Sequence, residues 1–227
     1  MGDFRIVAAG DAAWLVEWPA RIDPALSGRA VTLAETIKHT HADRIRDVVV
    51  GYCSVTVYFD PLHIDGEKLA ADLKQFARRV EDRPVVDGKL VDVGVCYGGE
   101  LGPDLPEVAA RAGSTESEVI ALHTAPTYRV YVVGFVPGFP YMAAVDARLA
   151  LPRRTVPRTR VPAGSVAIAG GQTGIYPTDT PGGWHLIGRT RVKPYDDNRA
   201  EPFLFKPGDR VRFHAIERAV GRRGATR

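Results

Sequence analysis

Four groups of residues have the types and spacing that could support chemistry, and all four lie after Gly88. The first is the run GGQTGIY from Gly170 to Tyr176. Adjacent glycines allow backbone N–H groups to point at an anion or a carbonyl oxygen, and Gln172 and Thr173 add side-chain donors. A glycine-rich hairpin turn is the alternative interpretation. Gln172 is a candidate catalytic residue, and the candidate substrate-binding residues are Gly170, Gly171, Thr173, Gly174 and Tyr176.

Arginines form the second group and gather in one proline-rich segment. They are Arg153, Arg154, Arg158 and Arg160. A guanidinium group pairs bidentately with a carboxylate or a phosphate, and the nearby prolines would stiffen the backbone into a preorganised clamp. Solvated loop charge is the alternative. Because Arg158 and Arg160 adjoin the VPAG turn at 161–164, we predict that these two arginines bind the substrate.

Single ionisable residues form the third group. Histidine titrates near neutrality and can move protons, which makes His123 and His185 catalytic candidates. A structural, hydrogen-bonded histidine is the alternative for His185, and a cation stabilised by a helix C-terminus is the alternative for His123. Glu100 is a candidate base or amine-binding group, whereas helix capping explains Asp104.

Aromatic residues in the stretch FVPGFPY form the fourth group. Phe135, Phe139 and Tyr141 could line a pocket or contact a partner protein, because interface cores favour aromatic residues. Core packing is the alternative for either phenylalanine. Pro140, which follows Phe139, is a plausible cis-proline.

The composition excludes several classes of function. A net charge of +3 over 227 residues predicts no concentrated basic face and so no nucleic-acid partner. Cys53 and Cys96 are neither a disulfide framework nor a zinc site, and we predict no metal ligands. No apolar run approaches a membrane span, and the first residues lack a basic stretch before an apolar core. We therefore expect no membrane contact and a cytoplasmic location.

Motifs for nucleotide binding and nucleophilic attack are also missing. Gly88-Lys89 lacks the upstream glycine of a P-loop, and the glycines from Gly170 to Gly174 lack dinucleotide-binding spacing. Ser165 follows Gly164 but has no glycine two residues later, so it does not form a nucleophile elbow. No cofactor is therefore predicted to bind by a recognisable motif in this chain.

Two domains, 1–87 and 88–227, follow from the pattern of predicted elements. In the first, helices are predicted to begin at Asp23-Pro24 and near Asp65, where aspartate can cap and proline suits the first turn. The predicted strands are 4–8, 13–18, 48–52 and 54–59, and a further strand at 90–96 can belong to either domain. The order β-α-β-β-α-β from 13 to 96 is typical of a ferredoxin-like domain, and the charged segment 81–88 marks the boundary.

The second domain is predicted to be rich in β-strands, including 128–133 and 210–216, with two short helices. Asp104 and Glu107 could cap the first helix, which ends near Gly113, and Thr115 with Glu118 forms a capping box for the second. Such a region suits a barrel, and the whole chain is then of the α+β class. We expect this domain to hold any small ligand by itself.

Four contiguous motifs carry a family resemblance. They are CYGGELGPDL at 96–105, GFVPGFPYM at 134–142, PRTRVPAGSVAIAGGQTGIYP at 157–177 and TPGGWHLIGRT at 180–190. On these motifs the chain resembles the family known as the 5-oxoprolinase B subunit, allophanate hydrolase subunit 1 or KipI. The resemblance implies a cyclophilin-like barrel for the second domain.

The resemblance also implies a function. Enzymes of this type open the lactam of 5-oxo-L-proline to L-glutamate and require ATP in the assembled complex. The implied partners are a C-type subunit, also called allophanate hydrolase subunit 2, and an A-type subunit. On this interpretation Arg158 or Arg160 holds the substrate carboxylate, and Gln172 with the Gly170–Gly174 backbone stabilises the oxyanion. The isolated chain is then expected to be inactive.

Three other functions stay open at this point. The KipI resemblance implies an inhibitor of a sensor histidine kinase. Related domains also occur as the carboxyltransferase part of urea carboxylase-like enzymes. A cyclophilin-like fold allows a peptidyl-prolyl isomerase, although fold alone does not carry function.

Overall fold

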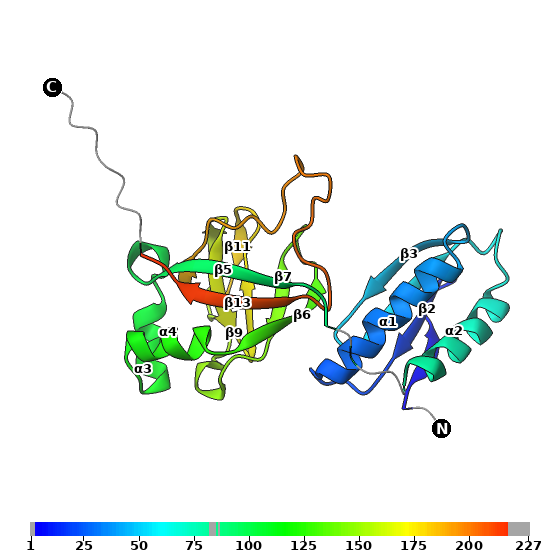
Figure 1. The fold of residues 1–227 in the computed structure, drawn as a ribbon, viewed down its shortest axis with the longest axis horizontal. Helices are drawn as coiled ribbons and strands as arrows, with labels where there is room; N and C mark the ends of the chain where they lie inside the picture. The colour runs from blue at the N-terminus through cyan, green and yellow to red at the C-terminus, as the bar shows by residue number, and fades with distance from the viewer. Residues whose placement is uncertain (1–2, 82–84, 86, 218–227) are drawn as a thin grey trace.

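The chain folds into two domains that meet at a narrow junction (Figure 1). The computed structural model describes residues 3–81, 85 and 87–217. The first domain contains β1 (Arg5–Ala8), β2 (Ala13–Glu17), α1 (Pro24–Thr40), β3 (Ile45–Val50), β4 (Ser54–Phe59) and α2 (Gly66–Val80). Half of the predicted boundary segment 81–88, at 82–84 and 86, lies outside the described residues.

The second domain begins with β5 and is built mainly of strands. Its helical elements are η1 (Gly99–Leu101), α3 (Leu105–Ala112), α4 (Glu116–Thr124) and η2 (Ala147–Leu149). Its strands are β5 (Leu90–Tyr97), β6 (Thr127–Val133), β7 (Pro140–Ala143), β8 (Arg158–Val161), β9 (Ser165–Ala169), β10 (Gln172–Ile175), β11 (Thr180–Gly182), β12 (His185–Arg189) and β13 (Arg210–Ala215).

Local signals in the first domain produce the elements that they predict. Asp23 caps α1 by accepting a hydrogen bond from the Ala25 N–H at 2.8 Å, and Pro24 occupies the first turn. The apolar face predicted for α2 is buried as a set: Leu69, Leu73, Phe76, Ala77 and Val80. This face and that of α1 cover the antiparallel sheet β1-β2-β4-β3.

The last strand of the expected ferredoxin-like pattern belongs to the other domain. β5 pairs with β12 and, in parallel, with β13, and its Val93 and Val95 are fully buried in the barrel core. The place beside β2 is taken by β1, which precedes the predicted repeat. The sequence left 90–96 open between the two domains, and the structure has this strand in the barrel, where closure buries its apolar side chains.

The barrel is closed in the order β10-β7-β6-β13-β5-β12-β9, which confirms the α+β class with a β-barrel second domain. Closure leaves no unpaired sheet edge. α3 and α4 pack together at one side of the barrel, against β12 and β13 (Figure 1). The peptide before Pro140 is trans, and in the described part of the chain the cis peptide lies between Ala143 and Ala144.

At the ends of α3 and α4, two predicted signals are confirmed and one was wrong. Thr115 and Glu118 form the predicted reciprocal capping box of α4, and Gly113 ends α3 with a left-handed φ of +63°. Asp104 precedes α3, but its side chain makes no capping hydrogen bond. That carboxylate is instead used by the candidate site.

The capping box gives a direct test of the local signal that starts α4. Thr115→Ala removes the side-chain acceptor for the Glu118 N–H, so we expect a loss of about 1 kcal/mol in the free energy of unfolding. Chemical denaturation measures this loss. Ser117→Ala, an exposed change on the same helix, is the matched control and should shift the midpoint little. Equal midpoints for the two variants would contradict the capping role.

Candidate functional site

A cavity of about 220 Å³ opens on the outer side of the barrel, and its wall is mainly aromatic. The rings that line it are Phe135, Phe139, Tyr141, Tyr176 and Trp184. Glycine backbone at Gly182 and Gly183 completes the wall. Such a surface suits a small flat molecule that can lie against ring faces.

Phe139 is the centre of this ring cluster and is 2% exposed. Its ring meets those of Tyr141, Tyr176 and Trp184 edge to face, with centroids 4.8, 5.1 and 5.4 Å apart. Gly174 allows this packing, because a Cβ there would lie 2.6 Å from the Phe139 ring. The predicted residues Phe139, Tyr141, Gly174 and Tyr176 are therefore brought together, with Gly174 supporting the wall of the cavity.

Phe135 stands at the edge of the cavity in an unusual conformation. Its side chain is 63% exposed, its φ is +67°, and its ring lies 6.0 Å from that of Phe139. A left-handed backbone is costly for a bulky residue, and such strain clusters at functional sites. This strained and exposed ring makes the cavity rim a functional candidate.

Arg153 supplies the positive charge of the cavity. Within the described chain it is the one charged residue in the lining; it is exposed, and its guanidinium makes no hydrogen bond or ion pair with another described residue. Burial raises the pKa of the Tyr141 and Tyr176 hydroxyls, and the Arg153 charge acts in the opposite direction on both. An unpaired guanidinium beside aromatic rings can bind a carboxylate carried on a small apolar body.

Asp104 fixes the segment that carries Arg153. Its buried carboxylate accepts two hydrogen bonds from Arg158, at 2.8 and 2.7 Å, and one from Arg154 at 2.9 Å. It also accepts the Leu186 N–H at 2.7 Å, while its own N–H donates to the Leu186 carbonyl at 3.0 Å. This cluster, which we call the Asp104 clamp, ties the arginine segment to α3 and to β12.

Electrostatics keep the Asp104 clamp ionised. Burial alone would raise the pKa of Asp104, but hydrogen bonds from Arg158 and Leu186 and the charges of Arg158 and Arg154 outweigh it. The pKa of this carboxyl therefore lies below its ordinary value. Charge-assisted, bidentate contacts of this kind are the strong ones in proteins.

The two arginines predicted to bind substrate are already paired. Arg158 belongs to the Asp104 clamp, and Arg160 is exposed and paired with Asp179. Neither lines the aromatic cavity, whereas the neighbouring Arg153 does. The sequence gives no reason to choose Arg153 over the other arginines, because neighbouring residues do not show which arginine of the segment lacks a carboxylate partner.

The glycine-rich run from Gly170 to Gly174 forms a hairpin turn, as its alternative interpretation predicted. Gly170 and Gly171 are the two-residue loop between β9 and β10, with a φ of +56° at Gly170. The Gly170 N–H donates to the Leu151 carbonyl at 2.6 Å. Gln172 lies just beyond and donates from Nε2 to the Tyr52 hydroxyl of the first domain at 2.6 Å. The run therefore serves the barrel and the domain junction.

His123 is a neutral residue of the barrel core. Thr173 donates its hydroxyl to the Ala167 carbonyl, so the His123 Nε2–H donates to Thr173 Oγ1 at 2.9 Å, and Nδ1 accepts from Tyr97 at 2.7 Å. Burial lowers the pKa of His123 to about 3. A cation stabilised by the α4 terminus is therefore excluded at neutral pH, and neither His123 nor Thr173 reaches the cavity.

His185 and Glu100 also lie apart from the cavity lining. His185 is 1% exposed, and its Nε2 contacts the Pro152 carbonyl at 2.9 Å. Its Nδ1 is buried and has no partner within the described residues. Glu100 is exposed on η1, beside a separate cavity of about 350 Å³. The structure does not bring the four catalytic candidates together.

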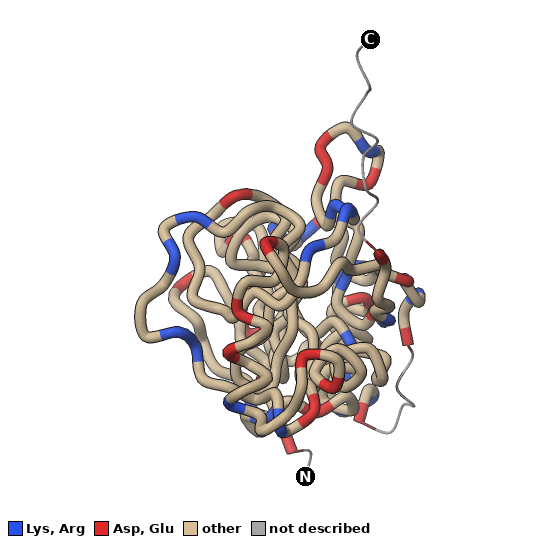
Figure 2. Tube along the Cα trace, turned by 90° about the vertical axis from the view of Figure 1, so that its left-hand side faces the viewer, with Lys and Arg blue, Asp and Glu red and all other residues tan. Residues whose placement is uncertain are grey.

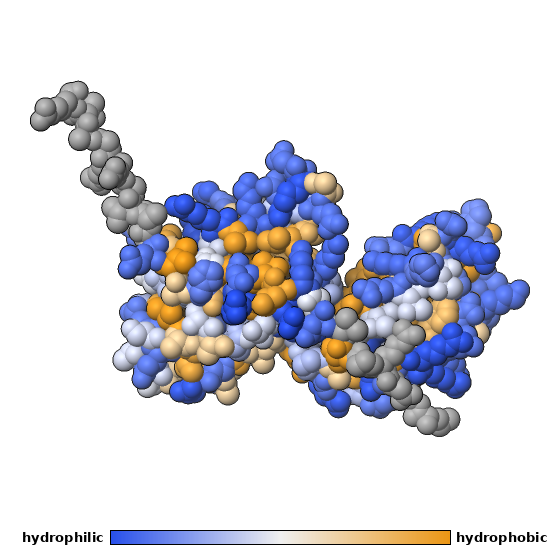
Figure 3. Space-filling model, viewed as in Figure 1, coloured by the Kyte–Doolittle hydropathy of each residue, from blue (hydrophilic) through white to orange (hydrophobic). Residues whose placement is uncertain are grey.

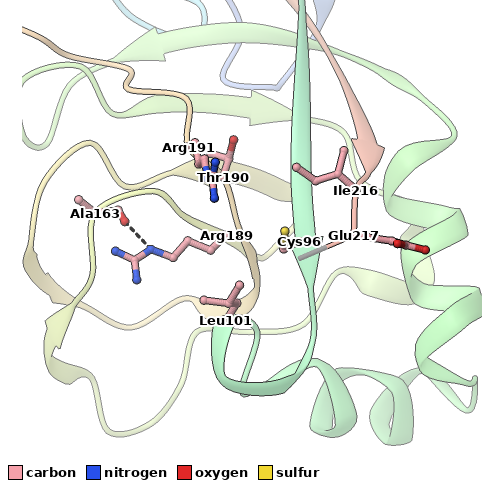
Figure 4. A pocket seen from close by; sticks show the side chains of 8 residues that line it. All are labelled: Cys96, Leu101, Ala163, Arg189, Thr190, Arg191, Ile216 and Glu217. Carbon is pink, nitrogen blue, oxygen red and sulfur yellow. Dashed lines mark hydrogen bonds between the residues drawn. The ribbon is translucent and has the colours of Figure 1, made fainter. Parts of the chain in front are cut away.

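A larger cavity of about 520 Å³ occupies another side of the barrel (Figure 4). Leu101 and Ile216 give it apolar wall, and Arg189 and Arg191 add charge. Figure 4 shows the Arg189 side chain turned toward Ala163, whose carbonyl oxygen accepts its Nε–H at 2.8 Å. None of the ring residues of the aromatic cavity lies here.

The charged side chains outside these cavities form no further centre. The described residues contain no cluster of three histidine, cysteine, aspartate or glutamate side chains suited to a metal ion. Their helices are too short or too polar to cross a membrane. Basic and acidic residues are interspersed along the trace (Figure 2).

Comparisons with known proteins point to one family. The family "Carboxyltransferase domain, subdomain C and D" matches residues 4–205. The 5-oxoprolinase B subunit of Bacillus subtilis (strain 168) is 36% identical over 223 residues, which cover 94% of this chain and 93% of that protein. That of Haemophilus influenzae is 44% identical over 171 residues, or 74% and 78% of the two chains.

Solved structures agree with this result. The crystal structure of TTHA0988 superposes with a TM-score of 0.80 at 41% identity over 90% of this chain, which spans 40% of that longer chain. The urea amidolyase of K. lactis has a TM-score of 0.74 at 20% identity, over 94% of this chain and 15% of that one. This second likeness shows the fold alone.

The Asp104 clamp predicts a stability loss. Asp104→Asn removes the negative charge that pairs with both Arg154 and Arg158. We expect the free energy of unfolding to fall by about 2 kcal/mol, a loss between those measured for exposed and for fully buried ion pairs. Asp43→Asn makes the same chemical change at an exposed carboxylate and is the control. Denaturant titration near pH 7 compares them, and equal losses would contradict the clamp.

The same pair of variants tests the depressed pKa. An aspartate in the unfolded chain has a pKa of about 3.9, and the pKa of Asp104 in the folded chain lies below this value. The stabilisation by the ionised carboxylate is therefore complete above about pH 3.9 and is lost as the pH falls through the folded pKa. The stability difference between wild type and Asp104→Asn should therefore shrink as the pH falls from about 6 to about 3. A difference that stays constant over this range would show that Asp104 is not ionised in the clamp.

Proposed function

The chain belongs to the family of carboxyltransferase subdomains C and D, together with the 5-oxoprolinase B subunits, and on this premise we propose that its aromatic cavity binds 5-oxo-L-proline. The chain is then the substrate-binding subunit of a 5-oxoprolinase. The observation that carries the proposal is the unpaired Arg153 among the aromatic rings. 5-Oxo-L-proline has matching chemistry, because it combines one carboxylate with a small, flat lactam ring.

Each part of the cavity has a role in this proposal. Arg153 binds the substrate carboxylate bidentately, a role that the sequence predicted for Arg158 or Arg160. The rings of Tyr141 and Trp184 hold the lactam, and Phe135 closes over it and excludes water. Gly182 supports the wall indirectly, because the missing Cβ at this position leaves the space that the Tyr176 ring occupies.

The energetic difficulty of the reaction explains why binding and orientation matter. A lactam carbonyl is a poor electrophile, and phosphorylation of its oxygen by ATP would create a leaving group. The described lining offers one cation, aromatic rings and glycine backbone, which suit holding the substrate rather than transferring protons. We assign ATP binding and proton transfer to the assembled complex. A substrate already held and oriented by this cavity would then react there at a lower entropic cost.

The partners in the proposal are the C-type and A-type subunits, and the compartment is the cytoplasm. The relatives are named as B subunits, which implies further subunits. Phe135 offers an exposed ring at the cavity rim, where a partner could complete the site. Figure 3 also shows an apolar area on the barrel face that carries β5 and β13. Leu90, the first residue of β5, and Ile216, which follows β13, are each 42% exposed.

The carboxyltransferase alternative has weaker support than lactam opening: the matched family is named for a carboxyltransferase domain, and a putative urea carboxylase is 28% identical over 128 residues, or 53% of this chain and 10% of that protein. The likeness to urea amidolyase rests on fold at 20% identity, so it does not favour carboxyltransferase chemistry. The kinase-inhibitor and isomerase interpretations stay untested.

Arg153 provides the main test. In the complex reconstituted with C-type and A-type subunits, Arg153→Gln should lower kcat/KM for 5-oxo-L-proline about ten- to hundredfold, the effect of losing hydrogen bonds to a charged group. Arg191→Gln, at an exposed arginine outside the aromatic cavity, is the matched control and should leave kcat/KM unchanged. Wild-type kinetics for Arg153→Gln would remove the aromatic cavity from the site.

A site that is completed by partner subunits predicts that this chain has no activity by itself. The purified chain should show no 5-oxo-L-proline-dependent release of phosphate from ATP, and addition of the C-type and A-type subunits should produce it. Phosphate release with and without substrate is the measurement. Full activity from the single chain would refute the division of labour.

A further inference from the structure

Tyr52 lies at the tip of the hairpin that joins β3 to β4 in the first domain. The tip is held tightly, because the Gly51 N–H donates to the Ser54 carbonyl at 2.8 Å and the Trp18 N–H donates to the Cys53 carbonyl at 2.9 Å. The Tyr52 side chain is therefore presented from a fixed turn.

The ring and hydroxyl of Tyr52 contact the barrel domain. The ring stacks on Tyr131 at 6.0 Å and meets Tyr141 edge to face at 6.2 Å. The hydroxyl accepts the Gln172 Nε2–H at 2.6 Å. These three partners lie on β6, β7 and β10, so one residue of the first domain bridges three neighbouring barrel strands.

One of these contacts reaches the aromatic cavity directly. Tyr141 lines the cavity and packs against Phe139 and Trp184, with centroids 4.8 and 5.8 Å away. Tyr52 packs against the same ring. The Arg153 charge also acts on the Tyr52 hydroxyl, whose pKa burial raises. Tyr52 therefore supports a wall of the cavity close to its cation.

Holding the two domains together does not depend on Tyr52 alone. Arg129, on β6, donates to the Ser27 hydroxyl at 3.2 Å and pairs with Asp87 at 3.0 Å. This second junction has no residue in the cavity lining. A change at Tyr52 can therefore alter the cavity while the Arg129 contacts keep the domains docked.

We propose that Tyr52 is a positioning residue of the aromatic cavity and that the first domain is thereby part of the ligand site. This inference rests on the proposed function for the identity of the ligand. It reverses the expectation that residues 88 onward hold a small ligand by themselves. It also gives Gln172 a role, because this candidate catalytic residue positions Tyr52 rather than contacting substrate.

The experiment uses the full chain, with three substitutions. Tyr52→Ala removes ring and hydroxyl, Tyr52→Phe keeps the ring and loses the Gln172 hydrogen bond, and Tyr58→Ala removes a tyrosine that is 43% exposed on the same sheet. NMR titration with 5-oxo-L-proline, followed at the Trp184 indole N–H, gives Kd. The reconstituted complex gives KM and kcat.

The expected effect falls on binding. Tyr52→Ala should raise Kd and KM about tenfold, the scale of losing aromatic contacts, with kcat changed less than about twofold. Tyr52→Phe should recover most of the affinity, and Tyr58→Ala should match wild type. If Tyr52→Ala does not fold, Tyr52→Leu replaces it, with the same expectation. Wild-type Kd in the folded variant would overturn the positioning role.

A readout without ligand separates this inference from the proposed function. Tyr52→Ala should shift the Tyr141 ring and Trp184 indole signals and leave the Trp14 indole, which donates to the Gly66 carbonyl in the first domain, in place. Unmoved Tyr141 and Trp184 signals would overturn the inference. Absence of 5-oxo-L-proline binding by wild type and by the complex would overturn the proposed function, while these shifts still decide the role of Tyr52.

Discussion

The carboxylate of Asp104 is the constraint on which the candidate site depends. It joins three parts of the barrel domain, since Arg154 and Arg158, the Leu186 N–H and the start of α3 all meet at this group. Without it, two neighbouring guanidinium groups would repel each other beside a strand end. With it, the proline-rich arginine segment has one fixed path. Arg153 then faces the aromatic cavity because its neighbour is held on the other side.

This arrangement divides one cluster of arginines into structural and binding roles. Arg154 and Arg158 are paired with Asp104, and Arg154 also with Glu107, whereas Arg153 lines the aromatic cavity without such a pairing. Arg153 is exposed at the cavity mouth, so its guanidinium is free to pair with an arriving anion. The first domain contributes through Tyr52, which holds Tyr141 against the same cavity. In our proposal, binding uses both domains and a partner protein completes the chemistry.

Local sequence signals predicted much of the fold, and distant contacts account for the errors. The α2 face, the Asp23 cap and the Thr115 capping box depend on residues within one or two helical turns, and all three were confirmed. Among the residues that line the aromatic cavity, Phe135, Phe139 and Tyr141 were candidates because they lie together in FVPGFPY, whereas Trp184 was not a candidate. The pairing of Asp104 with Arg158 spans 54 positions, and that of Tyr52 with Gln172 spans 120. No local pattern shows either, so Arg153 and Tyr52 were missed.

A crystal structure of the assembled enzyme with 5-oxo-L-proline tests the central claim most directly. The account predicts the carboxylate oxygens about 3 Å from the guanidinium nitrogens of Arg153 and the lactam ring against Tyr141 and Trp184, with Arg158 still bound to Asp104. Substrate in the larger cavity beside Arg189, or held entirely by a partner protein, would contradict it.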